Sequence, residues 1–521
     1  MEILRTEKEH FTDEDILSAI GNHQATVKEL DSLWNYYKAL NTAIKSRKAV
    51  DDATNPNYNI SVGYGRKLVT TFVGYGYRNG YITYSIADTK ESKGDLKVTP
   101  EKNSSTLSTD EPIVEEKVVP EPIGKTPKEK YLELIENIYK MNNEGIKTSR
   151  NGRNMAIFGI AYDILYLDSQ VAMKPDGFTM KNIPKFFNVD PREVILFYDN
   201  SPEPKKKIGI RYYKLDEKRY SVEVYYSDKI QKYERYLKEN DNTWKLKLTG
   251  TFPNFFSTIP IVPYPYGDDL MGVIRSIKEL IDVYDILISD SLNEFDRFAH
   301  AYLIMKKFGI TNPEKKKEPG VFSQALAILK RSRVFEYVPG DASISFLTKD
   351  VPSDFINFIT TCIKDLIHVM SHIPDFSSKT GAIAGVAIQR LMYDFENLVS
   401  STDPDFDSGL YDRLCIITSF LNNADKTLKG NPWDITITHK RNSPLNLQDF
   451  AQTAVLMKNA GFSSYLIADI MPDDIIPDVE AELARQKEDK LTSFENIDDI
   501  NTPFNSNEDE TNDEEIVEDE E

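Results

Sequence analysis

The residues of this chain that could support chemistry form a few short patterns. His368 and His372 are four residues apart, a spacing that places two imidazoles on one side of a helix and can bind a metal ion. No third ligand is nearby in the sequence, and the glutamate of a metalloprotease motif is absent between them. We therefore expect two ordinary histidines at a helix end, with no metal site and no cofactor.

A nucleotide-binding loop is the second pattern to weigh. Gly124-Lys125-Thr126 matches the end of a phosphate-binding loop, but that motif needs another glycine where Val119 stands. The match also lies in a polar stretch with no strand before it. With six histidines scattered over the chain and no Ser/His/Asp arrangement in view, we expect no enzyme. A nucleotide-hydrolysing enzyme stays as the less favoured alternative.

Two further patterns could contact a polyanion or a protein partner. One is a polar loop whose candidate contact residues are His372, Ser377, Ser378, Lys379 and Thr380. The other is a basic cluster formed by Lys306, Lys307, Lys315, Lys316, Lys317, Lys330, Arg331 and Arg333. Lys379 could equally be an ordinary exposed loop lysine, and the basic cluster could be a solvated face.

Amphipathic helices must position these patterns. Apolar residues at helical spacing predict a long helix over about 269–299 and another over about 355–370. A third helix is expected from Gly385, with a kink or break at Asp403-Pro404 because proline lacks an amide hydrogen. The polar loop thus lies between two helices, from which a mobile segment can project into a space.

The rest of the chain mixes helices and strands, so we expect an α+β fold. Thr12 followed by acidic residues predicts a helix start, with helix to about residue 48. Period-two alternation over 192–264 predicts an antiparallel meander. A short strand is expected at 433–438, and 445–490 should form two or three short helices, one of which ends near Gly461.

Length and charge set further bounds. The chain has 521 residues, which suggests three or four domains, and its 40% hydrophobic content fits ordered cores. Of the net charge of −20, the segment 491–521 contributes 13 acidic residues and no Lys or Arg, leaving a mildly acidic body. Such a tail is expected to be disordered, as is the Lys/Glu/Pro-rich stretch 88–127. A protein that wraps DNA tightly would be basic, so any nucleic-acid contact should be loose.

The two cysteines, Cys362 and Cys415, give no disulfide framework and are expected to be small core residues on apolar helix faces. The N-terminal residues do not form a signal peptide, and no run of about 18 apolar residues predicts a membrane span. We therefore expect a soluble protein made in a reducing compartment.

Taken in order, these parts resemble the portal proteins of tailed bacteriophages, in the branch typical of long non-contractile-tailed phages. The matching segments are Asn55-Pro56-Asn57, Gly74-Tyr75 to Tyr84, Gly159-Ile160-Ala161-Tyr162 with Tyr166, Ile259-Pro260-Ile261 before Leu280-Ile281-Asp282-Val283-Tyr284, and Ile373-Pro374-Asp375-Phe376 before Gly385-Val386-Ala387-Ile388. Their order over most of 50–490 carries the resemblance. Two departures are the long 88–127 insertion and Pro404 within the long helix.

The resemblance implies a portal fold with an α/β wing, a helical stem, a small α/β clip, a tunnel loop with a long spanning helix, and a helical crown. The implied boundaries are 1–268 for the wing, 269–299 and 351–371 for the stem helices, 300–350 for the clip, 372–384 for the tunnel loop, 385–444 for the long wing helix and closing strand, 445–490 for the crown and 491–521 for the acidic tail.

The resemblance also implies a function. Portal proteins form a ring, usually of twelve subunits, at one capsid vertex, assembled in the host cytoplasm. The genome enters and leaves through the ring, which docks the terminase large subunit and head–tail adaptors and contacts major capsid and scaffolding proteins. By this analogy, the polar loop would touch double-stranded DNA without reading its sequence, and the basic cluster would be a docking surface. The alternative is another virion structural protein, an adaptor or a minor head protein.

Overall fold

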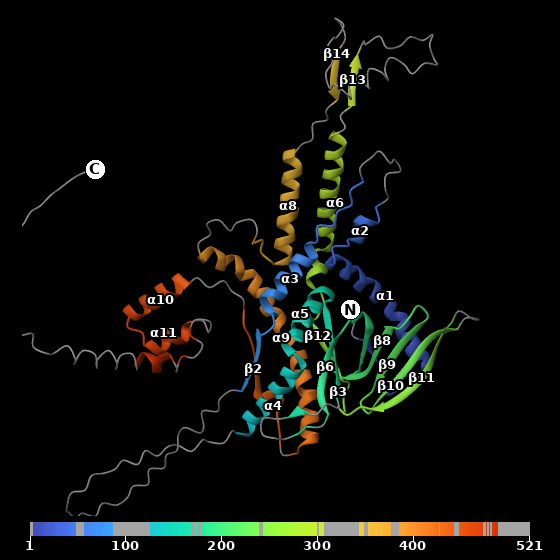
Figure 1. Ribbon diagram of the computed structural model, residues 1–521, viewed down its shortest axis with the longest axis vertical. Helices are drawn as coiled ribbons and strands as arrows, with labels where there is room; N and C mark the ends of the chain where they lie inside the picture. The colour runs from blue at the N-terminus through green and yellow to red at the C-terminus, as the bar shows by residue number, and fades with distance from the viewer. Residues whose placement is uncertain are drawn as a thin grey trace, which may run out of the picture. The chain divides into compact units, whose positions relative to one another are not determined.

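The computed structural model describes most of the chain between residues 4 and 487 (Figure 1). The described residues are 4–47, 57–86, 126–168, 172–173, 179–180, 182–238, 243–299, 302–306, 343–347, 353–376, 385–426, 428–441, 447–471, 476, 479 and 482–487. They divide into a large unit, residues 1–383 with 387–442, and a small unit, residues 384–386 with 443–521. The expected disordered stretches, 88–127 and 491–521, lie almost wholly outside the described residues.

A six-stranded sheet carries the meander that alternation predicts. Its order is β1 (Leu4–Arg5), β7 (Val194–Tyr198), β8 (Lys206–Lys214), β9 (Arg219–Tyr225), β10 (Lys229–Lys238) and β11 (Thr243–Pro253). Strands β7 to β11 are antiparallel neighbours, which confirms the meander. Strand β1 adds to the edge in parallel with β7, a pairing that two residues of sequence could not predict.

Helix α1 (Asp13–Tyr37) packs on this sheet, with Ile16 and Ile20 in its core. Thr12 caps the helix through a capping box with Asp15, as the sequence predicts. The helix ends before residue 48, because Ala39 adopts a left-handed φ of 57°. The short helix α2 (Thr42–Lys45) follows.

A second, three-stranded sheet lies at the centre of the large unit. Its order is β12 (Ile261–Pro265), β3 (Ile160–Asp168) and β6 (Ile183–Val189), all antiparallel neighbours. The helices α4 (Pro127–Asn142) and α5 (Glu144–Phe158) precede β3. The remaining strands pair two by two: β2 (Ile82–Ile86) with β15 (Ile435–His439), β13 (Tyr302–Lys306) with β14 (Ser343–Leu347), and β4 (Ala172–Met173) with β5 (Thr179–Met180).

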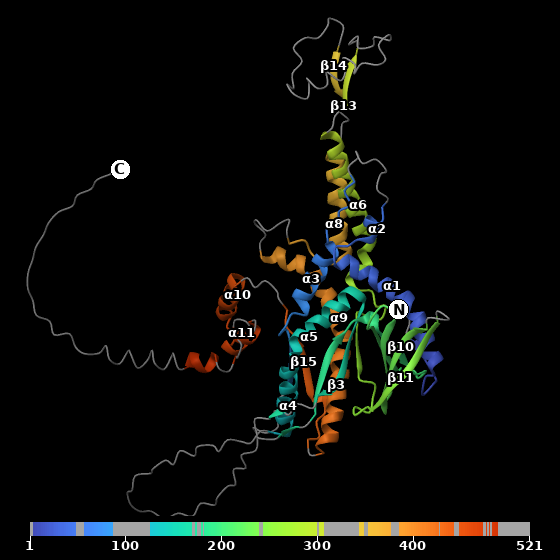
Figure 2. The same cartoon turned by 45° about the vertical axis from the view of Figure 1, so that its right-hand side comes forward.

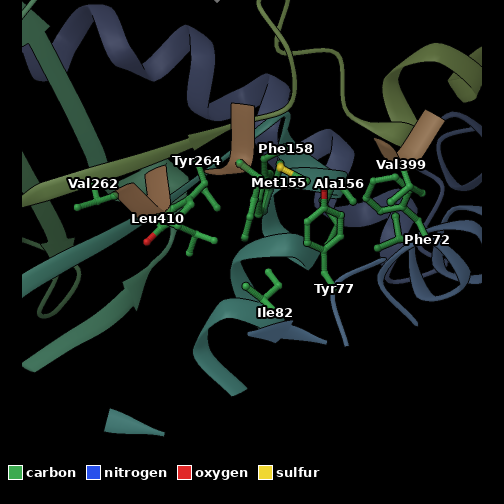
Figure 3. Close-up of a cluster of buried hydrophobic side chains, with 14 of the residues drawn as sticks. Phe72, Tyr77, Ile82, Met155, Ala156, Phe158, Val262, Tyr264, Val399 and Leu410 are labelled. Atoms are coloured by element: carbon green, nitrogen blue, oxygen red, sulfur yellow. The ribbon is translucent and has the colours of Figure 1, made fainter. Parts of the chain in front are cut away.

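The main hydrophobic core joins segments that are far apart in the sequence (Figure 3). It unites α3 (Tyr64–Gly76) and α5 with the central sheet and the long helix α9 (Gly385–Ala424). Figure 3 labels ten of its buried side chains, Phe72, Tyr77, Ile82, Met155, Ala156, Phe158, Val262, Tyr264, Val399 and Leu410. Helix α9 is therefore part of the core and not an appendage.

A buried ionic network fixes α9 further. Arg413 is fully buried and donates to Glu144 at 2.7 Å and to Asp163 at 3.4 Å. Its guanidinium also lies over the rings of Tyr139 and Phe186. Burial raises the pKa of Asp163, and Arg413 opposes that rise. The network ties α9 to α5 and β3.

We expect a kink or a break at Pro404, and the structure excludes the break, because helix α9 continues through this residue. Pro404 has no amide hydrogen for the Ser400 carbonyl, so the backbone ladder is weakened at this turn. The Thr402 hydroxyl donates to the Val399 carbonyl at 2.8 Å, a type of bond that bends helices. Figures 1 and 2 show α9 (orange) changing direction along its length while staying one helix.

The small unit contains α10 (Leu447–Asn459) and α11 (Ser464–Ile470), and residues 482–487 are helical as well. Gly461 lies just after α10 with a φ of 86°, the left-handed conformation that ends helices and that the sequence predicts. The Ser463 side chain caps α11 by accepting from the Leu466 amide. The short helices of 445–490 are thus confirmed where the chain is described.

Candidate functional site: the α6–α8 hairpin

Two long helices lie side by side in the large unit (Figures 1 and 2). They are α6 (Val273–Ala299) and α8 (Ser353–Ser371), which agree with the predicted helices within four residues at their starts. Their facing sides bury Ile277 and Ile281 from α6 and Ile363 and Ile367 from α8. The polar loop starts at the end of α8, at His372.

An extended segment, residues 57–62, is bound along another side of α6. Side chains on successive turns of the helix accept from every second backbone amide of the segment. The three bonds join Tyr58 to Asn293 at 2.6 Å, Ile60 to Ser289 at 2.9 Å and Val62 to Asp285 at 3.0 Å. Segment 57–62 therefore acts as a strap that is bound to one polar stripe of α6 and stiffens this helix.

Helix α8 carries a second apolar stripe that nothing in the described chain covers. Its members are Phe355, Phe358, Cys362, Leu366 and Val369, at helical spacing on the side away from the core. Phe358 and Val369 are 64% and 63% exposed. The expectation that Cys362 is a core residue is wrong, because the thiol is exposed on this stripe. The apolar residues of this stripe are visible in the sequence. Helical spacing alone does not tell, however, whether α8 has one apolar face or two, or which of them is covered by the fold.

Helix α8 is capped at its C-terminal end by hydrogen bonds of His368 and His372. The His368 ring shares a hydrogen bond with the Ile373 carbonyl at 2.8 Å. His372 adopts a left-handed φ of 54° and donates its amide to the Val369 carbonyl at 3.2 Å, which ends the helix. Burial lowers the pKa of His368, so the ring is neutral near pH 7.

Asp375 pins the segment that leaves α8. Its carboxylate accepts from Lys67 of α3 at 3.0 Å and from Lys364 of α8 at 2.5 Å. The His368 ring is a further neighbour at 3.9 Å. The hydrogen bond to Asp375 raises the pKa of Lys364, so this lysine stays protonated at neutral pH. We call Lys67, Lys364, His368 and Asp375 the Asp375 cluster; sequence reasoning did not identify it, because its members come from three separate segments.

His368 and His372 lie in different environments and do not form a common metal site. His368 is buried against Tyr64, whereas His372 is exposed. Among the residues that the structure describes, no group of three or more His, Cys, Asp or Glu side chains is placed to hold a metal ion. The described helices also include none with the length and hydropathy to cross a membrane.

The structure places only part of the predicted contact residues. Of the polar loop, it describes His372, while Ser377, Ser378, Lys379 and Thr380 lie outside the described residues. Of the basic cluster, it describes the backbone of Lys306, which pairs with Ser343 at the end of β13. The others, Lys307, Lys315, Lys316, Lys317, Lys330, Arg331 and Arg333, lie outside the described residues.

Comparison with known proteins gives two findings. Residues 18–491 match the family model described as "Phage portal protein, SPP1 Gp6-like". A portal protein of Bacillus phage SPP1 is similar to the chain, 22% identical over 311 residues, which cover 57% of this chain and 60% of the relative. The aligned region is thus shorter than two thirds of that relative.

Proposed function

We propose a function from one premise: this chain belongs to the SPP1 Gp6-like family of phage portal proteins. The family is one of structural proteins of the virion. From this premise, copies of the chain form a ring at a unique capsid vertex, and the ring is the channel for genome packaging and ejection. The ring usually has twelve subunits in such proteins.

The observation that carries this proposal is the uncovered apolar stripe of α8. A helix with one apolar stripe against its own fold and a second one facing solvent needs a further partner. In a closed ring, the same head-to-tail contact joins each copy to the next, so every copy has a neighbour that can cover its α8 stripe. The ring therefore accounts for the exposed phenylalanines, which an isolated chain would leave in water.

The family fold assigns the parts of the chain. We propose that residues 1–268 form the wing, α6 and α8 the stem, and 300–350, with the β13–β14 pair, the clip. The segment 372–384 would be the tunnel loop, 385–444 the long wing helix and closing strand, 445–490 the crown and 491–521 an acidic tail. Arg413 supports this reading, because its network binds the long helix firmly into the wing.

The tunnel loop would be the contact with double-stranded DNA. DNA must slide without sticking, and a wall rich in Lys and Arg would bind phosphates strongly. A mildly acidic ring with one cation per loop, Lys379, keeps such contacts few and independent of sequence. The Asp375 cluster supports this role, since it holds the first residues of the loop against α3 and α8. Deleting the loop without any change in genome packaging or retention would contradict it.

The clip would dock other components. We propose that the basic residues of 306–333 contact acidic groups on the terminase large subunit or on a head–tail adaptor. Replacing Lys315, Lys316 and Lys317 by Glu should reduce binding of these partners in a pull-down, and unchanged binding would remove the assignment. Major capsid and scaffolding proteins are the further partners expected at the vertex. An adaptor or a minor head protein is the alternative, although adaptors are usually much shorter.

The direct test of the ring contact is a charge on the α8 stripe. Phe358→Glu should convert the multimer to monomer in size-exclusion chromatography with light scattering, because a buried unpaired carboxylate is costly at an interface. Thr361→Glu is the matched control, since this exposed residue lies on α8 beside the stripe.

The thiol of Cys362 gives an independent reading of the same contact. It should react slowly with a thiol reagent in the multimer and quickly in the Phe358→Glu monomer. A multimer that survives Phe358→Glu and leaves Cys362 freely reactive would show that the stripe is not the contact.

A further inference from the structure

We place the bend of α9 at Pro404, in the turn that the end of α3 and the end of β15 contact. Helix α9 runs on both sides of Pro404, and the segment before the bend follows directly on 372–384. Since proline removes one bond of the helical ladder, the backbone alone does not set the direction of the first half. Side chains from outside the helix must set it.

Two basic side chains lie across the bend. Arg441 donates to Glu396 before Pro404, at 3.3 Å, and to Asp403 beside it. The ring of His439 bonds Asp407 after Pro404, at 2.7 Å. Its other nitrogen lies 3.6 Å from Asp403. Both basic residues belong to one short stretch of chain, so they connect the two halves of α9 through a common support.

Helix α3 supports the same turn from another side. The Tyr77 hydroxyl donates to Asp403 at 3.2 Å, and the Tyr75 hydroxyl donates to Glu396. A Cβ on Gly76 would lie 2.5 Å from Val399 Cγ1, so the backbone of α3 touches α9 closely at the bend. The carboxylates at the bend are thus held from two elements, and burial raises the pKa of Asp403 while His439 and Arg441 oppose that rise.

We propose that His439 and Arg441 are positioning residues that set the bend of α9 at Pro404 and so aim the first half of the helix. The pairs are sheltered: the side chains of His439 and Arg441 are 9% and 14% exposed. Sheltered pairs are screened less by salt than surface pairs are. Because all these pairs lie within one copy of the chain, we expect the bend in the isolated chain as well as in an assembly.

A distance measurement by spin labels tests the proposal. The labels are placed on Tyr393→Cys, an exposed position in the first half of α9, and on Ile146→Cys in α5, with Cys362 and Cys415 replaced by Ser. A second pair, Ile146→Cys with Asn423→Cys, reports on the other half. Labelled chain is diluted in unlabelled chain, so that each distance is measured within one copy.

Arg441→Gln should broaden and shift the distance from residue 146 to residue 393 and leave the distance to residue 423 unchanged. Tyr393 lies 11 residues before Pro404, an arm of about 16 Å, and a change of roughly 20° in the bend moves its end by about 6 Å. Lys128→Gln is the control, because Lys128 forms an exposed pair with Asp434 close to β15 and does not touch α9 at the bend.

An unchanged distribution in folded Arg441→Gln overturns the proposal. If Arg441→Gln does not fold, the same distance is measured in His439→Gln, which keeps the Arg441 pairs. An unchanged distribution in that variant likewise overturns the proposal. Failure of the ring proposal would leave this result untouched, since the distances are intramolecular.

Discussion

At the scale of single residues, Arg413 and Asp375 are sheltered charged groups that each lie in a network of several partners. Arg413 has two carboxylates and two aromatic rings around it, and Asp375 has two lysines. Removing one partner from such a network leaves a buried charge uncompensated, which costs more than the pair contributes. These residues therefore hold segments of the chain in place.

His23 gives the clearest pH dependence at this scale. Burial lowers the pKa of His23 to about 4, and its ring bonds the Tyr212 hydroxyl at 2.8 Å. Because the unfolded chain takes up this proton near pH 6.5 and the folded chain does not, the contribution of His23 is complete above about pH 6.5. It is lost as the pH falls toward about 4, and amounts to roughly 3 kcal/mol.

Urea unfolding of His23→Gln between pH 7 and pH 4 measures this contribution. The variant should lose less stability on acidification than the parent chain. Gln24→Ala is the control, because it removes a hydrogen bond to the same Tyr212 hydroxyl without removing a titratable group. Equal acid sensitivity of the parent and His23→Gln would contradict the assignment.

At the scale of elements, the sequence predicted those features that follow from local chemistry. The Thr12 cap, the meander, the long helices and the end of α10 near Gly461 were all legible from residue type and spacing. The central β12-β3-β6 sheet was not, because its strands come from separate regions of the chain and pair only in the fold. Of the kink or break expected at Pro404, only the break was wrong, since contacts with other elements keep α9 helical across it.

Two glycines show the difference between a position fixed by contacts with the rest of the fold and a position governed by helix propensity alone. Gly159 ends α5 with a φ of 83°, and a Cβ there would lie 1.8 Å from the Leu270 carbonyl oxygen. Gly159→Ala should therefore lower the free energy of unfolding by more than about 3 kcal/mol, through backbone strain and overlap together. Gly21 lies within α1 with open space around its Cβ position, so Gly21→Ala should raise stability by about 1 kcal/mol.

Chemical denaturation of both glycine variants decides this prediction. A small effect of Gly159→Ala would mean that the α5–β3 junction can relax away from Leu270. Such a result would weaken the argument that the segment Gly159-Ile160-Ala161-Tyr162 is fixed by its geometry.

At the scale of the whole molecule, the sequence pointed to the family before the fold was known, through the order of short segments along the chain. It could not locate the contact between copies that we propose on α8. The α8 stripe and the inner face of the same helix have the same apolar pattern, and only the fold tells which of them is already covered. The Asp375 cluster was likewise beyond sequence reasoning, because Lys67 lies some three hundred residues from its partner.

Electron microscopy of the purified full-length protein, under conditions that permit assembly, tests the central claim most directly. The account predicts end-on views of closed rings with a central hole wide enough for double-stranded DNA, and loss of these rings in Phe358→Glu. Compact single particles without an aperture, from a chain that is folded by circular dichroism, would contradict it.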